Sequence, residues 1–172
     1  MNNKIVKEII SWITMIIIAV VLSMFINKFI IMNVEVPTGS MVDTINIDDK
    51  VSTFRLAYTF SDPERGDIVV FPYPDDESID YIKRIIGLPG ETIEGKDGYV
   101  YIDGVKLIED DYVMDLLDED FGPYEIPEGS CFMMGDNRLS SEDARGWTNK
   151  FVSIDKIKGK AIFTYPRLSW LW

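Results

Sequence analysis

Three short segments carry residue types that could together catalyse the hydrolysis of an amide bond. The first contains Gly39-Ser40-Met41, where the glycine permits a tight turn that presents the Ser40 hydroxyl as a nucleophile. The second places Lys83 among isoleucines, and burial there would lower its pKa and make it a general base. The third is the polar segment 135–145, which follows an apolar run. Taken singly, these segments also fit a linker turn, an edge-strand lysine that blocks aggregation, and a capped loop or salt-bridge cluster.

The sequence contains no histidine, and this narrows the chemistry considerably. It excludes Ser-His-Asp and Cys-His mechanisms and the usual zinc sites, so lysine or carboxylates must transfer protons. We expect neither a metal nor a cofactor. The single cysteine, Cys131, lies in an apolar run and is predicted to be a buried core residue. The stretch 109–120 holds seven acidic residues without EF-hand spacing, which predicts a solvated, mobile loop.

The charge of the chain is strongly negative and unevenly distributed. Its 17 basic and 29 acidic residues give a net charge of −12, which argues against nucleic acid as a partner. Residues 1–33 carry three lysines and one glutamate, a net +2 that leaves −14 for the rest. A basic start and an acidic body indicate two parts in two environments.

An apolar segment near the N-terminus predicts a membrane anchor. Residues 9–26 form a run of 18 residues without a charge, and as a helix this run would be about 27 Å long, close to the hydrocarbon thickness of about 30 Å. Lys4 and Lys7 precede it, so the positive-inside rule places the N-terminus in the cytoplasm. A cleavable signal peptide and a buried core helix are the alternatives, but no Ala-x-Ala site follows the run. We therefore expect an anchor at 1–32 and an extracytoplasmic catalytic domain at 33–172.

The body has the pattern of short β-strands separated by turn residues. The type I′ turn signal Asp103-Gly104 joins two apolar runs and predicts a hairpin over 99–108. No sustained helical periodicity follows the anchor, so the body is predicted to be mainly antiparallel β. The other strands are expected at 67–71, 79–86, 130–134 and 160–165.

Together the segments resemble the type I signal peptidases, the single-span bacterial leader peptidases with a Ser–Lys dyad. The anchor, the serine segment, the strand at 65–69, the lysine segment and Gly135-Asp136-Asn137-Arg138 follow the family's order and cover nearly the whole chain. The resemblance implies a β-sheet catalytic domain of the signal peptidase and repressor-protease kind behind one N-terminal transmembrane helix.

The resemblance also implies a role for individual side chains. Ser40 would be the nucleophile and Lys83 its base, with the Ser40 N–H and the Thr38 hydroxyl forming the oxyanion hole. Ser141 would orient the lysine. Site-supporting residues would be Arg84, Asp136, Asp143 and Arg145, with Arg84 expected to pair with Asp136, and pockets for small side chains would be lined by Val34, Val36, Tyr81 and Ile82.

The implied activity is that of a membrane-bound serine endopeptidase of the plasma membrane. It would remove N-terminal signal peptides from exported preproteins after small residues, typically Ala-x-Ala, through an acyl-enzyme. Its partners would be preprotein signal peptides, the lipid bilayer and the export machinery.

Three positions depart from the family pattern, and two rival interpretations remain. Asp43 replaces the usual proline, Ala144 the usual serine, and Gly146-Trp147 stands where an aromatic pair is common. One rival is a self-cleaving repressor-type Ser–Lys protease, although those proteases lack an N-terminal span. The other is a catalytically silent, membrane-anchored β-domain that binds exported proteins, against which the Ser40, Lys83 and Ser141 set argues.

Overall fold

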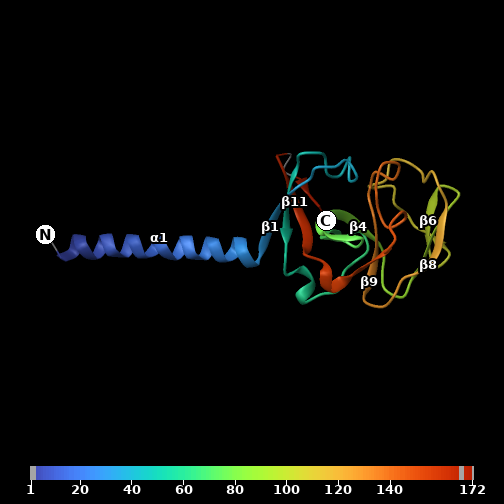
Figure 1. The fold of residues 1–172 in the computed structure, drawn as a ribbon. Coiled ribbons are helices and arrows are strands. Elements are labelled where there is room, and N and C mark those ends of the chain that lie inside the picture. Colours follow the sequence, from blue (N-terminus) through green and yellow to red (C-terminus); the bar gives the residue numbers. More distant parts are fainter. Residues whose placement is uncertain (1–2, 167–168, 172) are drawn as a thin grey trace.

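A long apolar helix extends from a β-rich body in this computed structural model, which describes residues 3–166 and 169–171 (Figure 1). The helix α1 (Asn3–Phe29) has 27 residues, about 40 Å at 1.5 Å per residue. Its most apolar 18-residue window has a mean hydropathy of 2.7, and none of that window is buried against the protein. The helix is therefore long and apolar enough to cross a membrane.

The larger sheet contains the strands that carry the candidate site. In the described residues it has eight antiparallel strands in the order β1-β2-β11-β3-β4-β9-β10, with β12 paired to β11. The strands are β1 (Ile31–Glu35), β2 (Lys50–Phe54), β3 (Ile68–Tyr73), β4 (Asp76–Gly87), β9 (Ser130–Met134), β10 (Phe151–Ser153), β11 (Gly159–Tyr165) and β12 (Ser169–Trp170).

A smaller sheet lies at the end of the body that is farthest from α1 (Figure 1). Its described strands follow the order β7-β6-β5-β8. The turn between β6 and β7 has positive φ at Asp103 (51°) and Gly104 (77°), which confirms the predicted hairpin. The strands are β5 (Thr92–Lys96), β6 (Tyr99–Ile102), β7 (Val105–Lys106) and β8 (Phe121–Glu125), and two short 3₁₀ helices, η1 (Ala57–Thr59) and η2 (Ile154–Lys156), lie in connections.

The predicted mainly antiparallel β fold behind an N-terminal helix is confirmed, with differences at strand ends. β3 continues through Pro72 to Tyr73, two residues beyond the predicted strand end at 71, and Pro72 lies opposite Asp80 of β4. β1 begins at Ile31, two residues after the helix end at Phe29. Six short strands that mix polar with apolar residues were not predicted: β1, β2, β5, β8, β10 and β12.

The core covers both faces of the central strands. Along β3, Val69 and Phe71 belong to the larger apolar cluster, whereas Ile68 and Val70 belong to the smaller one. Cys131 lies in the larger cluster, as predicted for a core residue. Central strands with two covered faces can hold a charged side chain away from water.

Phe132 is a sensitive point of this core. Its ring is fully buried and lies 5.7 Å from the Phe121 ring and 6.1 Å from the Tyr124 ring. Phe132→Ala should lower the free energy of unfolding by about 3–5 kcal/mol, because it removes these contacts and leaves a cavity. Denaturant unfolding of the full chain in detergent measures this. Phe60→Ala is the matched control, since Phe60 is 89% exposed; equal effects of the two substitutions would contradict the assignment of the core.

Candidate active site

Ser40 lies in a tight turn between β1 and β2, and the core holds this turn in place. Met41 and Ile45 on the same turn are fully buried in the smaller apolar cluster, and the Ile45 N–H donates to the Met41 carbonyl at 2.7 Å. Ser40 itself is only 5% exposed. The nucleophile candidate is therefore fixed by two buried neighbours in its own segment.

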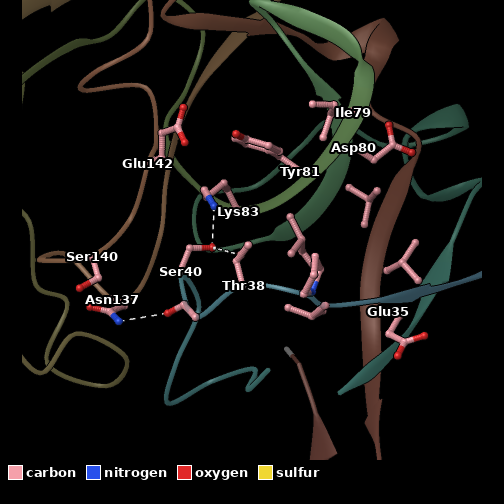
Figure 2. A pocket seen from close by; sticks show the side chains of 16 residues that line it. Glu35, Thr38, Ser40, Ile79, Asp80, Tyr81, Lys83, Asn137, Ser140 and Glu142 are labelled. Carbon is pink, nitrogen blue, oxygen red and sulfur yellow. Dashed lines mark hydrogen bonds between the residues drawn. The ribbon is translucent and has the colours of Figure 1, made fainter. Parts of the chain in front are cut away.

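Lys83 projects from β4 directly at this serine. Its Nζ donates a hydrogen bond of 2.6 Å to Ser40 Oγ, and the lysine is 4% exposed (Figure 2). Val69 of β3 pairs with Lys83 across the strands, and the ring of Tyr81 lies 5.1 Å from Nζ. Residues 43 positions apart in the sequence thus meet as a buried pair.

Burial sets the protonation of Lys83. Desolvation lowers its pKa from 10.5 to about 8, against the opposing pull of three carboxylates, Asp143, Glu142 and Asp136. At pH 7 a lysine with this pKa is neutral in about one molecule in ten, compared with about one in 2,500 for a free lysine. The side chain can therefore take a proton from a serine hydroxyl near neutral pH.

An open cleft of about 580 Å³ runs past the pair, between the end of β1 and β4 (Figure 2). All four residues expected to form pockets for small side chains line it, and they present mostly apolar atoms. Its rim carries the carboxylates of Glu35, Asp80 and Glu142. The predicted pocket residues in its wall are Val34, Val36, Tyr81 and Ile82.

Thr38 stands beside the nucleophile at the exposed mouth of the cleft. Its Oγ1 lies 3.5 Å from Ser40 Oγ (Figure 2). A hydroxyl at this distance is placed to donate to an oxygen of a substrate bound to Ser40.

Ser141 does not make the lysine-orienting bond that the resemblance implied. Its Oγ is buried and has no hydrogen-bond partner in the part of the chain that the structure describes. The hydroxyl instead packs over Gly135, where a Cβ would collide with both Ser141 Oγ and the Ser40 carbonyl oxygen. The Ser141 carbonyl accepts a hydrogen bond of 3.4 Å from Arg145 Nη2, whereas Lys83 Nζ donates to Ser40 Oγ.

Arg84 and Asp136 form the predicted ion pair beside the dyad. Arg84 Nε and Nη2 donate to the two carboxylate oxygens of Asp136 at 2.8 and 2.6 Å. Arg84 Nη1 donates to the Gly66 carbonyl at 2.7 Å, and Thr44 Oγ1 donates to Asp136 at 2.5 Å. The pair thereby ties β4 to the segment that follows the nucleophile. Lys83 and Arg84 are both buried, although adjacent side chains of a strand point to opposite faces of the sheet.

Asp143 and Arg145 close segment 135–145 on itself. Arg145 Nε and Nη2 donate to Asp143 at 2.8 and 3.0 Å, and the Gly135 N–H donates to the same carboxylate at 3.0 Å. Asp143 is 1% exposed, so this pair is largely shielded from water. The expected pairing of Arg84 with Asp136 is therefore observed, and Asp143 pairs with Arg145.

Asn137 connects this segment to the nucleophile and was not predicted. Its backbone N–H donates to the Ser40 carbonyl at 3.1 Å, and its Nδ2 donates to the Gly39 carbonyl at 3.0 Å (Figure 2). Its place in the motif Gly135-Asp136-Asn137-Arg138 was the one signal available in the sequence.

The positions that depart from the family pattern lie in different surroundings. Asp43 is exposed, whereas Ala144 is fully buried and its N–H donates to the Met133 carbonyl at 3.1 Å. Trp147 packs its ring 5.9 Å from Tyr81, so it supports a wall of the cleft. Within the described residues, no cluster of three His, Cys, Asp or Glu side chains could hold a metal ion.

The chain is similar to known proteins over nearly its whole length. Residues 9–166 match the family model described as "Signal peptidase, peptidase S26". Signal peptidase I S of Bacillus subtilis (strain 168) is 35% identical over 170 residues, which cover 92% of this chain and 90% of that protein. Signal peptidase I of Bacillus licheniformis is 36% identical over 175 residues, covering 95% and 91%. A crystal structure of a signal peptidase I from Enterococcus faecalis V583 covers 58% of this chain and 97% of its own, with 36% identity and a TM-score of 0.47.

The pH dependence of peptide cleavage should report the lowered pKa of Lys83. A lysine acts as a general base in its neutral form, so with Lys83 as the base kcat/KM should rise with pH and level off above about 8. Glu142 raises the pKa of Lys83, so Glu142→Gln should move the rising limb to lower pH. Rates measured from pH 5 to 10 test both statements. Glu35→Gln, on the same rim, is the matched control, and a shift of the Glu142→Gln limb to higher pH would contradict the assignment.

Proposed function

The chain belongs to the signal peptidase family, peptidase S26, and is a serine endopeptidase that removes signal peptides, and we propose that Ser40 and Lys83 are its catalytic dyad. One observation carries this proposal: two buried side chains from distant segments meet at 2.6 Å on the wall of an open cleft. A lysine with a pKa of about 8 has the proton affinity that a base needs near neutral pH.

Acylation follows from this geometry. Neutral Lys83 accepts the Ser40 proton while Oγ attacks the carbonyl carbon of the scissile peptide bond. The resulting oxyanion accepts hydrogen bonds from the Ser40 N–H and the Thr38 hydroxyl. The carbon–nitrogen bond then breaks, and the Lys83 ammonium returns its proton to the leaving amine. The mature protein departs, and the signal peptide is left as an ester on Ser40.

Deacylation uses the same two side chains. Lys83, neutral again, removes a proton from a water molecule that attacks the ester carbon. The ester bond breaks, and the Ser40 alkoxide takes the proton from the lysine. The signal peptide leaves with a free carboxyl group, so protons balance over the cycle.

The cleft supports a preference for small side chains at the residue directly before the cut and at the residue two positions further back. Val34, Val36 and Ile82 present branched apolar groups that leave shallow room in its wall. We therefore assign cleavage after Ala-x-Ala sequences to this wall.

The anchor supports a fixed location for the activity. We propose that residues 1–32 form the cytoplasmic start and the span, and that 33–172 form the catalytic domain outside the plasma membrane. Lys4 and Lys7 in the first two turns of α1 favour this orientation, and Ser40 follows the helix end at Phe29 by only eleven residues. Preproteins delivered by the export machinery would then meet the cleft at the bilayer surface.

Ser40→Ala and Lys83→Ala should each reduce cleavage of a synthetic preprotein by at least about 10³-fold, since each removes a reacting group. The measurement is the release of mature protein by the full chain in detergent, with Ser61→Ala and Lys106→Ala as controls at exposed positions. Near-normal turnover by the Lys83→Ala protein would exclude the dyad. Binding without cleavage by the unaltered chain would instead favour a silent binding domain.

Substrate substitutions test the assignment of the cleft. Replacing the alanine before the cut by leucine should lower kcat/KM by about 10–200-fold, because extra methylenes do not fit a shallow pocket. The same change at the middle position of Ala-x-Ala should matter little. Mass spectrometry of the products locates each cut. Equal tolerance of leucine at all three positions would refute the assignment.

A further inference from the structure

Glu109 is a buried carboxylate that the proposed reaction leaves unused. It begins the acidic stretch 109–120, which was predicted to be solvated, yet Glu109 is 9% exposed and Leu117 is 8% exposed. Both of its oxygens accept hydrogen bonds from Arg138, at 2.8 Å from Nη1 and 2.5 Å from Nη2. The prediction of a wholly solvated loop is therefore wrong, because its first acid neutralises a buried arginine.

Arg138 belongs to the segment that holds the nucleophile. Its side chain is 2% exposed, and its Nε donates to the Gly135 carbonyl at 3.1 Å. Its own carbonyl accepts a hydrogen bond of 2.7 Å from Arg145 Nη2. The preceding residue, Asn137, makes the two bonds to the Ser40 segment. Glu109 thus reaches the backbone of Ser40 through one arginine and the residue next to it.

Tyr112 makes a second contact from the same turn to the other buried arginine. The Tyr112 N–H donates to the Glu109 carbonyl at 3.1 Å, and the Tyr112 hydroxyl donates to Glu109 Oε1 at 3.1 Å. The centre of its ring lies 4.1 Å from the guanidinium carbon of Arg84. Arg84 is therefore held between the Asp136 carboxylate and an aromatic face.

We propose that Glu109 and Tyr112 are positioning residues for the Ser40–Lys83 dyad, an inference that rests on the proposed function. The first turn of the acidic stretch contacts both Arg138 and Arg84. Each of these arginines holds one of the two segments that support the nucleophile. Without the Glu109 carboxylate, Arg138 would be a buried charge without its counter-ion, and segment 135–138 would have to shift toward water. The described residues that line the cleft include Val34 and Ile82, but they do not include either arginine or the turn that holds them. The loss should therefore appear in kcat, with KM little changed.

The experiment compares variants of the full chain in detergent with a synthetic preprotein. Glu109→Ala should lower kcat by about 10–100-fold, because a displacement near 1 Å at the reacting atoms has effects of this size. Glu109→Gln keeps an acceptor oxygen and should recover part of the loss. Tyr112→Phe keeps the ring over Arg84 and should resemble the unaltered chain, whereas Tyr112→Leu should lower kcat. Asp110→Asn and Asp111→Asn are matched controls on exposed neighbouring acids.

Two further measurements separate positioning from simple loss of folding. Thermal unfolding gives the folded fraction, and single-turnover acylation at a temperature where each variant is folded gives the rate of the chemical step. If Glu109→Ala does not fold, Glu109→Gln and Tyr112→Leu carry the test. Acylation rates equal to that of the unaltered chain, or losses confined to KM, would overturn the positioning role.

The outcomes also distinguish this inference from the dyad itself. An inactive Ser40→Ala protein beside fully active Glu109 and Tyr112 variants would overturn the positioning role alone. An active Ser40→Ala protein would overturn the dyad, whatever the Glu109 variants do.

Discussion

The removal of water from Lys83 is the constraint on which the rest of this structure depends. A fall in pKa from 10.5 to about 8 corresponds to a cost of about 3 kcal/mol whenever the lysine is charged. The protein meets this cost with a central strand whose two faces are covered by separate apolar clusters. Between pH 8 and 10.5 the unfolded chain binds the proton more readily than the folded one, so the cost disappears as pH rises through this range. A smaller core, or one that covered only one face of the strand, would exclude water from Lys83 less completely and would lower its pKa less.

The surrounding carboxylates offset only part of the effect that desolvation has on the pKa of Lys83. Asp136 and Asp143 are both nearly inaccessible to water, and each would raise the pKa of Lys83 strongly if it stood alone. Arg84 and Arg145 neutralise them with two-point hydrogen bonds. The same bonds shape the segment that contacts Ser40. The arginines therefore both neutralise the aspartates and help to position the nucleophile. Burial of these pairs has a structural consequence, since each arginine then requires its own counter-ion.

The features that could be predicted from the sequence are those with a local residue pattern or a match to a known family. The anchor, the hairpin at Asp103-Gly104 and the central strands have clear patterns, and the pairing of Arg84 with Asp136 came from the family resemblance. Contacts between distant segments were harder to foresee. Glu109 stands among six other acids of stretch 109–120, and composition alone suggests solvent there. Its burial depends on Arg138, which is 29 positions away. The orientation of Ser141 likewise depends on packing over Gly135, a property that spacing does not encode.

The path from the helix to the proposed nucleophile is short. The helix ends at Phe29, β1 begins at Ile31, and the wall of the cleft begins at Val34. A strand rises about 3.3 Å per residue, so the eleven residues from Phe29 to Ser40 span at most about 36 Å. β1 is the outermost strand of the larger sheet in the described residues, which leaves its free edge open toward an extended peptide. In the proposed topology, an apolar signal segment lying in the bilayer beside α1 would emerge next to this edge. In that topology the anchor would contribute through geometry, because it would hold the cleft at the height where the cleavage site leaves the lipid.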